Sequence, residues 1–148
     1  VHIALQQGEI AARNAARLLN RAAGALEEMD YALKLFAVFS HPQVAMVGLT
    51  EKDLAGREVL AASYPFNDHG KSLLMGESEG FVKLICERES RRILGGAVVG
   101  PEASELIHEV AVAMHFNATA ADLMRVPHYH PTLSEIWTYP AEELAAGS

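Results

Sequence analysis

Two side chains near the end of the sequence have the types and spacing of an acid/base pair. His130 is followed five residues later by Glu135, and Pro131 restricts the turn between them. A histidine exchanges protons near neutral pH, and a neighbouring carboxylate can orient its ring and stabilise its charged form. Thr132 and Glu135 also have the spacing of a capping box, in which each residue satisfies a free N–H at a helix start. The pattern alone leaves both interpretations open and favours the cap.

Other residues that could carry chemistry are better explained as structural. Cys86 is the only cysteine and lies in an apolar, strand-like run, which favours a buried, inert thiol. Gly70-Lys71-Ser72 lacks the first glycine of a phosphate-binding loop, because Pro65 occupies that position, so we expect a surface loop. Two pairs of histidines lack an evident third metal ligand: His108 with His115, and His128 with His130. We therefore predict no metal site.

Composition limits the class of protein. The chain has 148 residues, half of them hydrophobic, which is enough for one compact domain and a short tail. Twelve basic and nineteen acidic residues give a net charge of −7, which argues against nucleic acid or an anionic membrane as a partner. The first residues lack the pattern of a signal peptide, and no apolar run has the length of a membrane span. We expect a cytoplasmic protein, in keeping with its single cysteine.

The periodicity of apolar residues predicts an α+β fold. Residues 1–20 are predicted to form a helix, because small residues recur in them at helical spacing. Residues 21–35 have the composition of a connector. The predicted strands are 44–47, 59–66, 81–88 and 93–99, the last two forming a hairpin. We expect a long helix at 103–114. A second helix should begin with a capping box at Thr50, and a shorter one should follow the cap at Thr119. We expect a mostly antiparallel sheet with helices on one face.

Six segments, in order, resemble the dimeric flavin disulfide reductases, the FAD-dependent pyridine nucleotide-disulfide oxidoreductases. They are residues 29–31, 39–51, 76–84, 93–96, 100–107 and 130–135. Within that family the sequence is most similar to dihydrolipoamide dehydrogenase, the E3 component of 2-oxoacid dehydrogenase complexes. The resemblance implies that residues 36–148 form the dimerisation domain, with the fold typical of these reductases. It implies that residues 1–35 are the last helix of the flavin domain plus a connector.

The resemblance also implies roles for individual residues. His130 would exchange a proton with the substrate thiol at the partner subunit's FAD and redox disulfide, and Glu135 would orient and stabilise its ring. His130 and Pro131, joined by a cis peptide bond, would face the partner's flavin. Val1 and His2 would lie near the FAD of the intact enzyme, since the positive end of a helix dipole suits a flavin that gains negative charge on reduction.

Several features of a complete enzyme of this family are missing from the sequence. It has no glycine-rich dinucleotide turn and no pair of redox cysteines. We therefore expect a C-terminal fragment that binds no FAD and is inactive alone, whereas the full-length enzyme would use FAD and NAD. The expected partners are a second copy, the rest of the same polypeptide and, as a candidate, a 2-oxoacid dehydrogenase complex.

Two alternatives stay open at this point. One is a dimerisation module without chemistry, and the other is a reductase of the same family that acts on another disulfide, such as glutathione. Tyr129 stands where typical dihydrolipoamide dehydrogenases have alanine, which leaves the disulfide substrate open. The sequence also leaves the choice between NAD and NADP open. We expect Tyr129 to pack at the interface rather than to narrow the substrate channel.

Overall fold

A computed structural model describes residues 1–146 of the chain. The chain forms two compact units. The first unit, Val1–Lys34, contains helix α1 (His2–Leu19), as predicted, followed by an extended segment. Arg13 holds the two parts of this unit together through a bidentate contact with Glu27, with nitrogen–oxygen distances of 2.8 Å. No residue of α1 is buried. The second unit begins at Leu35 and contains all the strands.

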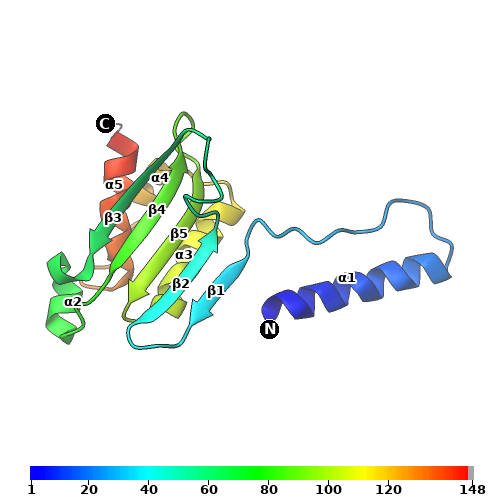
Figure 1. The fold of residues 1–148 in the computed structure, drawn as a ribbon, viewed down its shortest axis with the longest axis horizontal. Helices are drawn as coiled ribbons and strands as arrows, with labels where there is room; N and C mark the ends of the chain where they lie inside the picture. The colour runs from blue at the N-terminus through cyan, green and yellow to red at the C-terminus, as the bar shows by residue number, and fades with distance from the viewer. Residues whose placement is uncertain (147–148) are drawn as a thin grey trace. The chain divides into compact units, whose positions relative to one another are not determined.

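A five-stranded antiparallel sheet forms the centre of the second unit (Figure 1). Its strands are β1 (Leu35–Val38), β2 (Gln43–Gly48), β3 (Val59–Pro65), β4 (Phe81–Glu87) and β5 (Ile93–Gly100). Their order across the sheet is β1-β2-β5-β4-β3. Strand β5 is the central strand and β4 lies next to it. Together they form the predicted hairpin, and most of their residues are buried.

Three helices cover one face of this sheet, as Figure 1 shows: α3 (Ala103–His115), α4 (Ala120–Arg125) and α5 (Thr138–Ala146). Helix α3 packs on β5 and β2, and α5 packs on β3 and β4. Gly96 allows the close approach of α3, because a Cβ atom there would lie only 2.9 Å from Cγ1 of Val110. The main core lies between the helices and the sheet. The predicted fold class, a mostly antiparallel sheet with helices on one face, is confirmed.

Some local predictions were wrong. Thr50 and Asp53 form the hydrogen bonds of a capping box, but only turns follow, because Gly56 has a φ of +85° and the chain enters β3 at Val59. Gly70-Lys71-Ser72 is not a loop but the first turn of α2 (Gly70–Met75). A 3-10 helix, η1 (Phe66–Asp68), leads into it from the end of β3.

Residues 1–146 contain no helix that is long and apolar enough to cross a membrane.

Candidate functional site

The end of the second unit fixes the segment that carries His130. After α4 the chain runs through residues 126–133 into a 3-10 helix, η2 (Ser134–Trp137), which continues into α5. Trp137 anchors this helix, because its side chain is fully buried and its Nε1–H donates to the carbonyl of Leu106 in α3 at 3.1 Å. Tyr139 of α5 stacks on Tyr64 of β3, with 3.9 Å between ring centroids. The segment that follows the His130 turn is therefore anchored both to helix α3 and to strand β3.

His130 and Glu135 form the predicted pair within this turn. The His130–Pro131 peptide bond is cis, as predicted. Nδ1 of His130 lies 2.9 Å from Oε2 of Glu135. A carboxylate can only accept hydrogen bonds, so Nδ1 carries the hydrogen and Nε2 keeps a lone pair. Nε2 of the neutral ring is therefore the atom that can take a proton.

The two residues differ sharply in exposure. The side chain of His130 is 79% exposed, whereas that of Glu135 is only 13% exposed. The carboxylate is thus held by the fold, and the imidazole it orients extends into solvent. This arrangement suits a group that acts on something outside its own domain.

Glu135 also makes the two reciprocal contacts of the capping box that the sequence pattern allowed, although the N-cap of η2 is the residue after Thr132, Leu133. Its Oε1 accepts from the backbone N–H of Thr132 at 3.3 Å, and its own N–H donates to Oγ1 of Thr132 at 3.4 Å. The two interpretations of the pattern are therefore compatible, because one carboxylate oxygen serves the cap and the other faces His130. Both carboxylate oxygens of Glu135 therefore have a hydrogen-bond partner.

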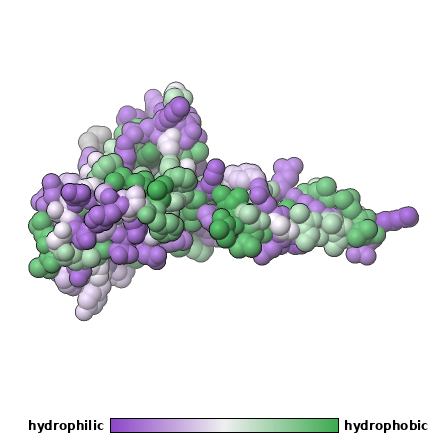
Figure 2. Space-filling model, turned by 60° about the horizontal axis from the view of Figure 1, so that its bottom comes forward, coloured by the Kyte–Doolittle hydropathy of each residue, from purple (hydrophilic) through white to green (hydrophobic). Residues whose placement is uncertain are grey.

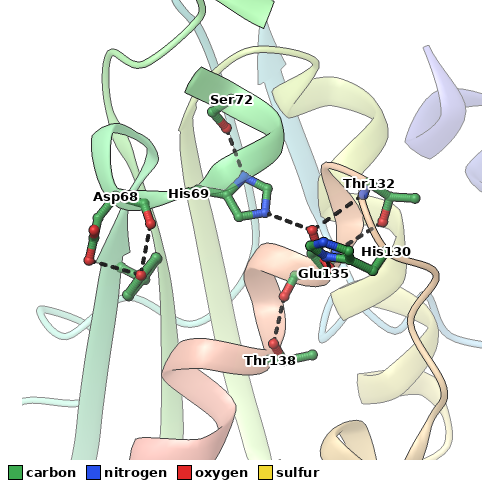
Figure 3. Close-up of polar contacts among 8 residues, drawn as sticks. Asp68, His69, Ser72, His130, Thr132, Glu135 and Thr138 are labelled. Atoms are coloured by element: carbon green, nitrogen blue, oxygen red, sulfur yellow. Dashed lines mark hydrogen bonds and ion pairs between the residues drawn. The ribbon is translucent and has the colours of Figure 1, made fainter. Parts of the chain in front are cut away.

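A second histidine contacts the same carboxylate, and Figure 3 shows Glu135 between the two rings. His69, at the start of α2, is fully buried, and its Nε2 lies 3.5 Å from Oε1 of Glu135. Its Nδ1 lies 2.8 Å from Oγ of Ser72. Burial lowers the pKa of His69 below its ordinary value, and the charge of Glu135 opposes that shift. The sequence pattern around His69 indicated only a turn.

The other candidate residues lie elsewhere. Val1 and His2 belong to the first unit, where they are exposed. His128 does not join His130 in a metal site; its Nε2 lies 2.5 Å from Oε1 of Glu109 in α3. Across the described residues 1–146, no group of three or more potential ligands is placed to hold a metal ion. Cys86 is fully buried in β4, and burial raises the pKa of its thiol to about 12, as expected for an inert cysteine.

The fold agrees with the comparison to known protein families. Residues 36–141 match the family model described as "Pyridine nucleotide-disulphide oxidoreductase, dimerisation domain". Because this match covers most of the chain, the chain belongs to the pyridine nucleotide-disulphide oxidoreductase family and contains its dimerisation domain. The predicted family is thereby confirmed.

Curated relatives narrow the resemblance to one kind of enzyme. The chain is 40% identical to a dihydrolipoyl dehydrogenase of Halobacterium salinarum over 148 residues, covering 99% of this chain and 30% of the relative. It is 38% identical to the dihydrolipoyl dehydrogenase of Bacillus subtilis over 149 residues, with the same two coverages. The chain thus spans about three-tenths of the length of these relatives.

Solved structures show the same fold. LpdA from Mycobacterium tuberculosis superposes with a TM-score of 0.76 at 26% identity, over 88% of this chain and 28% of that one. The HOCl-induced flavoprotein disulfide reductase RclA from Escherichia coli gives a TM-score of 0.75 at 21% identity, over 88% of this chain and 30% of its own length. At that lower identity the likeness to RclA shows the fold alone.

Proposed function

We propose that this chain is the C-terminal part of a dihydrolipoamide dehydrogenase, and that its His130–Glu135 pair is the acid/base dyad of that enzyme. The observation that carries the proposal is the contact of 2.9 Å between an exposed imidazole and a largely buried carboxylate. The similarity to dihydrolipoyl dehydrogenases along almost the whole chain supports it. Residues 1–35 would then be the last helix of the flavin domain with its connector, and 36–148 the dimerisation domain.

The chemistry follows from the hydrogen position on His130. Nδ1–H donates to Glu135, so Nε2 accepts the proton of a substrate thiol and leaves a thiolate, which is the nucleophile in disulfide exchange. In the reverse direction the same Nε2–H returns the proton. Glu135 stabilises the imidazolium that exists between these two steps. The proton is therefore exchanged at the atom that faces away from the fold.

The residues present fit the flavin cofactor of the family at an interface. His130 is exposed, as a group must be if it is to reach a flavin and disulfide held by a partner subunit. His130 and Pro131 would face the partner's FAD. Val1 and His2 would lie near the FAD of their own subunit, where α1 begins with N–H groups that have no intrahelical acceptor. When bound, FAD with NAD supplies the electron transfer that the side chains of this chain cannot perform.

A homodimer is part of this proposal. Hydrophobic residues reach the surface of the chain, as the green areas of Figure 2 show. In the second unit an apolar groove of about 480 Å³ lies between α3 and α4, and Val112, Phe116 and Val126 in it are more than half exposed. Tyr129, next to the dyad, is 83% exposed. Contact with a second copy would remove such surface from water. We further propose a cytoplasmic location and association with a 2-oxoacid dehydrogenase complex, by analogy with the E3 component.

The test uses the complete flavoprotein that carries this chain. Oxidation of dihydrolipoamide with NAD is measured for the wild type and for His130→Gln, with His115→Gln, an exposed histidine of α3, as the matched control. We expect turnover to fall by roughly a hundredfold or more in His130→Gln, the scale of lost acid/base catalysis, and to stay unchanged in the control. Unchanged turnover in His130→Gln would refute the proposal. A wild type that reduces glutathione disulfide but does not oxidise dihydrolipoamide would show that the substrate is a different disulfide.

A further inference from the structure

The carboxylate of Glu135 needs contacts from other residues to fix its orientation, because its own side chain does not fix it. The last torsion of a glutamate side chain is broad, so the carboxylate can rotate freely unless its oxygens are held. Only one rotation places Oε2 against Nδ1 of His130 while Oε1 faces the interior. The N–H of Thr132 contributes to this hold by donating to Oε1 at 3.3 Å, and a carboxylate oxygen can accept a further donor.

His69 stands on the interior side of the carboxylate and is itself firmly placed. Its N–H donates to the carbonyl of Phe66, and its carbonyl accepts from the N–H of Leu73, each at 3.1 Å. Its ring is fully buried, and Nε2 has no hydrogen-bond partner of good geometry although it lies 3.5 Å from Oε1 of Glu135. A buried polar atom without a partner is costly, about 1–3 kcal/mol, and calls for an explanation.

We propose that His69 is a positioning residue for the dyad: a neutral ring whose Nε2–H points at Glu135 and holds its carboxylate toward His130. This inference rests on the proposed function of His130 and Glu135. It adds an inner member, so that Ser72, His69, Glu135 and His130 form one line of polar contacts from α2 to the surface (Figure 3).

The contacts on both sides of the ring select this tautomer. The hydroxyl of Ser72 can donate to Nδ1, which leaves the hydrogen on Nε2, where it faces a carboxylate. The opposite tautomer would point a lone pair of Nε2 at the negative oxygen and is disfavoured. A ring protonated on both nitrogens carries a positive charge and is disfavoured by burial, which lowers the pKa of His69. The titratable groups around the ring are Glu135, His130 and Tyr139, whose ring meets it edge-on at 6.2 Å.

The first measurement is the tautomer of His69 in the wild-type protein. Long-range ¹H–¹⁵N correlation spectra at pH 7 distinguish the two ring nitrogens, and the His69 signals are those that vanish in His69→Gln. We expect a protonated Nε2 and an unprotonated Nδ1. A hydrogen on Nδ1 alone, or on both nitrogens, would overturn the proposal. This readout does not depend on activity.

The second measurement compares two substitutions in the complete flavoprotein. His69→Leu removes the donor, and we expect kcat to fall roughly two- to tenfold with KM unchanged, the scale of one lost hydrogen bond used in the chemical step. His69→Gln keeps an N–H₂ group in place of Nε2–H and should restore most of the rate. Leu54→Ala, a buried change in a separate apolar cluster, controls for lost stability.

The outcomes separate this inference from the proposed function. If His130→Gln is inactive but His69→Leu behaves like Leu54→Ala, only the role of His69 is refuted. A folded His69→Gln that is as slow as His69→Leu refutes it too. If His130→Gln keeps full activity, the function of the dyad fails, and the tautomer of His69 still decides whether it orients Glu135. Should His69→Leu not fold, His69→Gln and the spectra of the wild type remain decisive.

Discussion

Replacing Glu135 with glutamine tests whether its carboxylate supports the chemistry of His130 or only caps a helix. The carboxylate meets N–H donors on both oxygens: Thr132 on Oε1 and His130 on Oε2. A glutamine has one oxygen and one N–H₂ group. If its oxygen serves Thr132, its N–H₂ faces Nδ1 of His130 and moves the ring hydrogen to Nε2, so the base is lost. If its oxygen serves His130, two donors face each other at Thr132. Glutamine therefore loses either the basic Nε2 of His130 or the contact with Thr132.

The lost charge adds a second effect whose size follows from the distance. At 2.9 Å, the Coulomb attraction between a carboxylate and a positively charged ring is about 1.4 kcal/mol in a water-like dielectric, and glutamine lacks it. We expect Glu135→Gln to lower kcat/KM for dihydrolipoamide by between roughly tenfold and ten-thousandfold.

The assay is the pH–rate profile of the wild type, Glu135→Gln, His130→Gln and the double variant. An orienting carboxylate has nothing to orient once His130 is gone, so the double variant should be little worse than His130→Gln alone. A wild-type rate and profile in Glu135→Gln, or losses that simply add, would return Glu135 to the role of a cap.

Three further predictions concern the fold around the site. Cys86, buried and with its pKa raised to about 12, should react with a thiol reagent at pH 8 only when the domain unfolds, and rapid labelling of the native protein would contradict its burial. Trp137→Phe should lower the free energy of unfolding by about 1–3 kcal/mol in urea titrations, because it removes the buried hydrogen bond from Nε1–H and leaves a void. An unchanged free energy of unfolding would mean that η2 is not anchored on α3. His69 has a lowered pKa in the folded state, so the unfolded state binds more protons, and the free energy of unfolding should fall as the pH drops below about 6.5; an equally steep fall in His69→Gln would assign that acid sensitivity to other groups.

Local patterns in the sequence predicted the centre of the fold well. The hairpin expected at 81–88 and 93–99 is Phe81–Glu87 paired with Ile93–Gly100, and the periodic helix expected at 103–114 is Ala103–His115. The capping box at Thr119 opens α4 as expected. These elements carry their own signals, because a buried face imposes the period of its secondary structure on the sequence.

Other elements depend on distant partners and left little local signal. Strand β1, Leu35–Val38, has four residues and is defined by its pairing with β2. Helix α5 contains Pro140, which usually marks a helix break but is tolerated in the first turn. The site shows the same division. The spacing of His130 and Glu135 allowed either a contact between them or a cap, and the family resemblance favoured the contact, whereas His69 meets Glu135 only because α2 and η2 fold together.

The central claim is that His130 of one subunit serves the disulfide of the other, and subunit mixing tests it most directly. One kind of subunit carries His130→Gln, and the other lacks the redox cysteines of its flavin domain; each alone should be inactive. Random mixing makes about half of the dimers mixed, each with one complete site, so activity should return to about a quarter of the wild-type value. If His130 acted within its own subunit, no mixed dimer would contain a complete site, and a mixture as inactive as its parents would contradict this account.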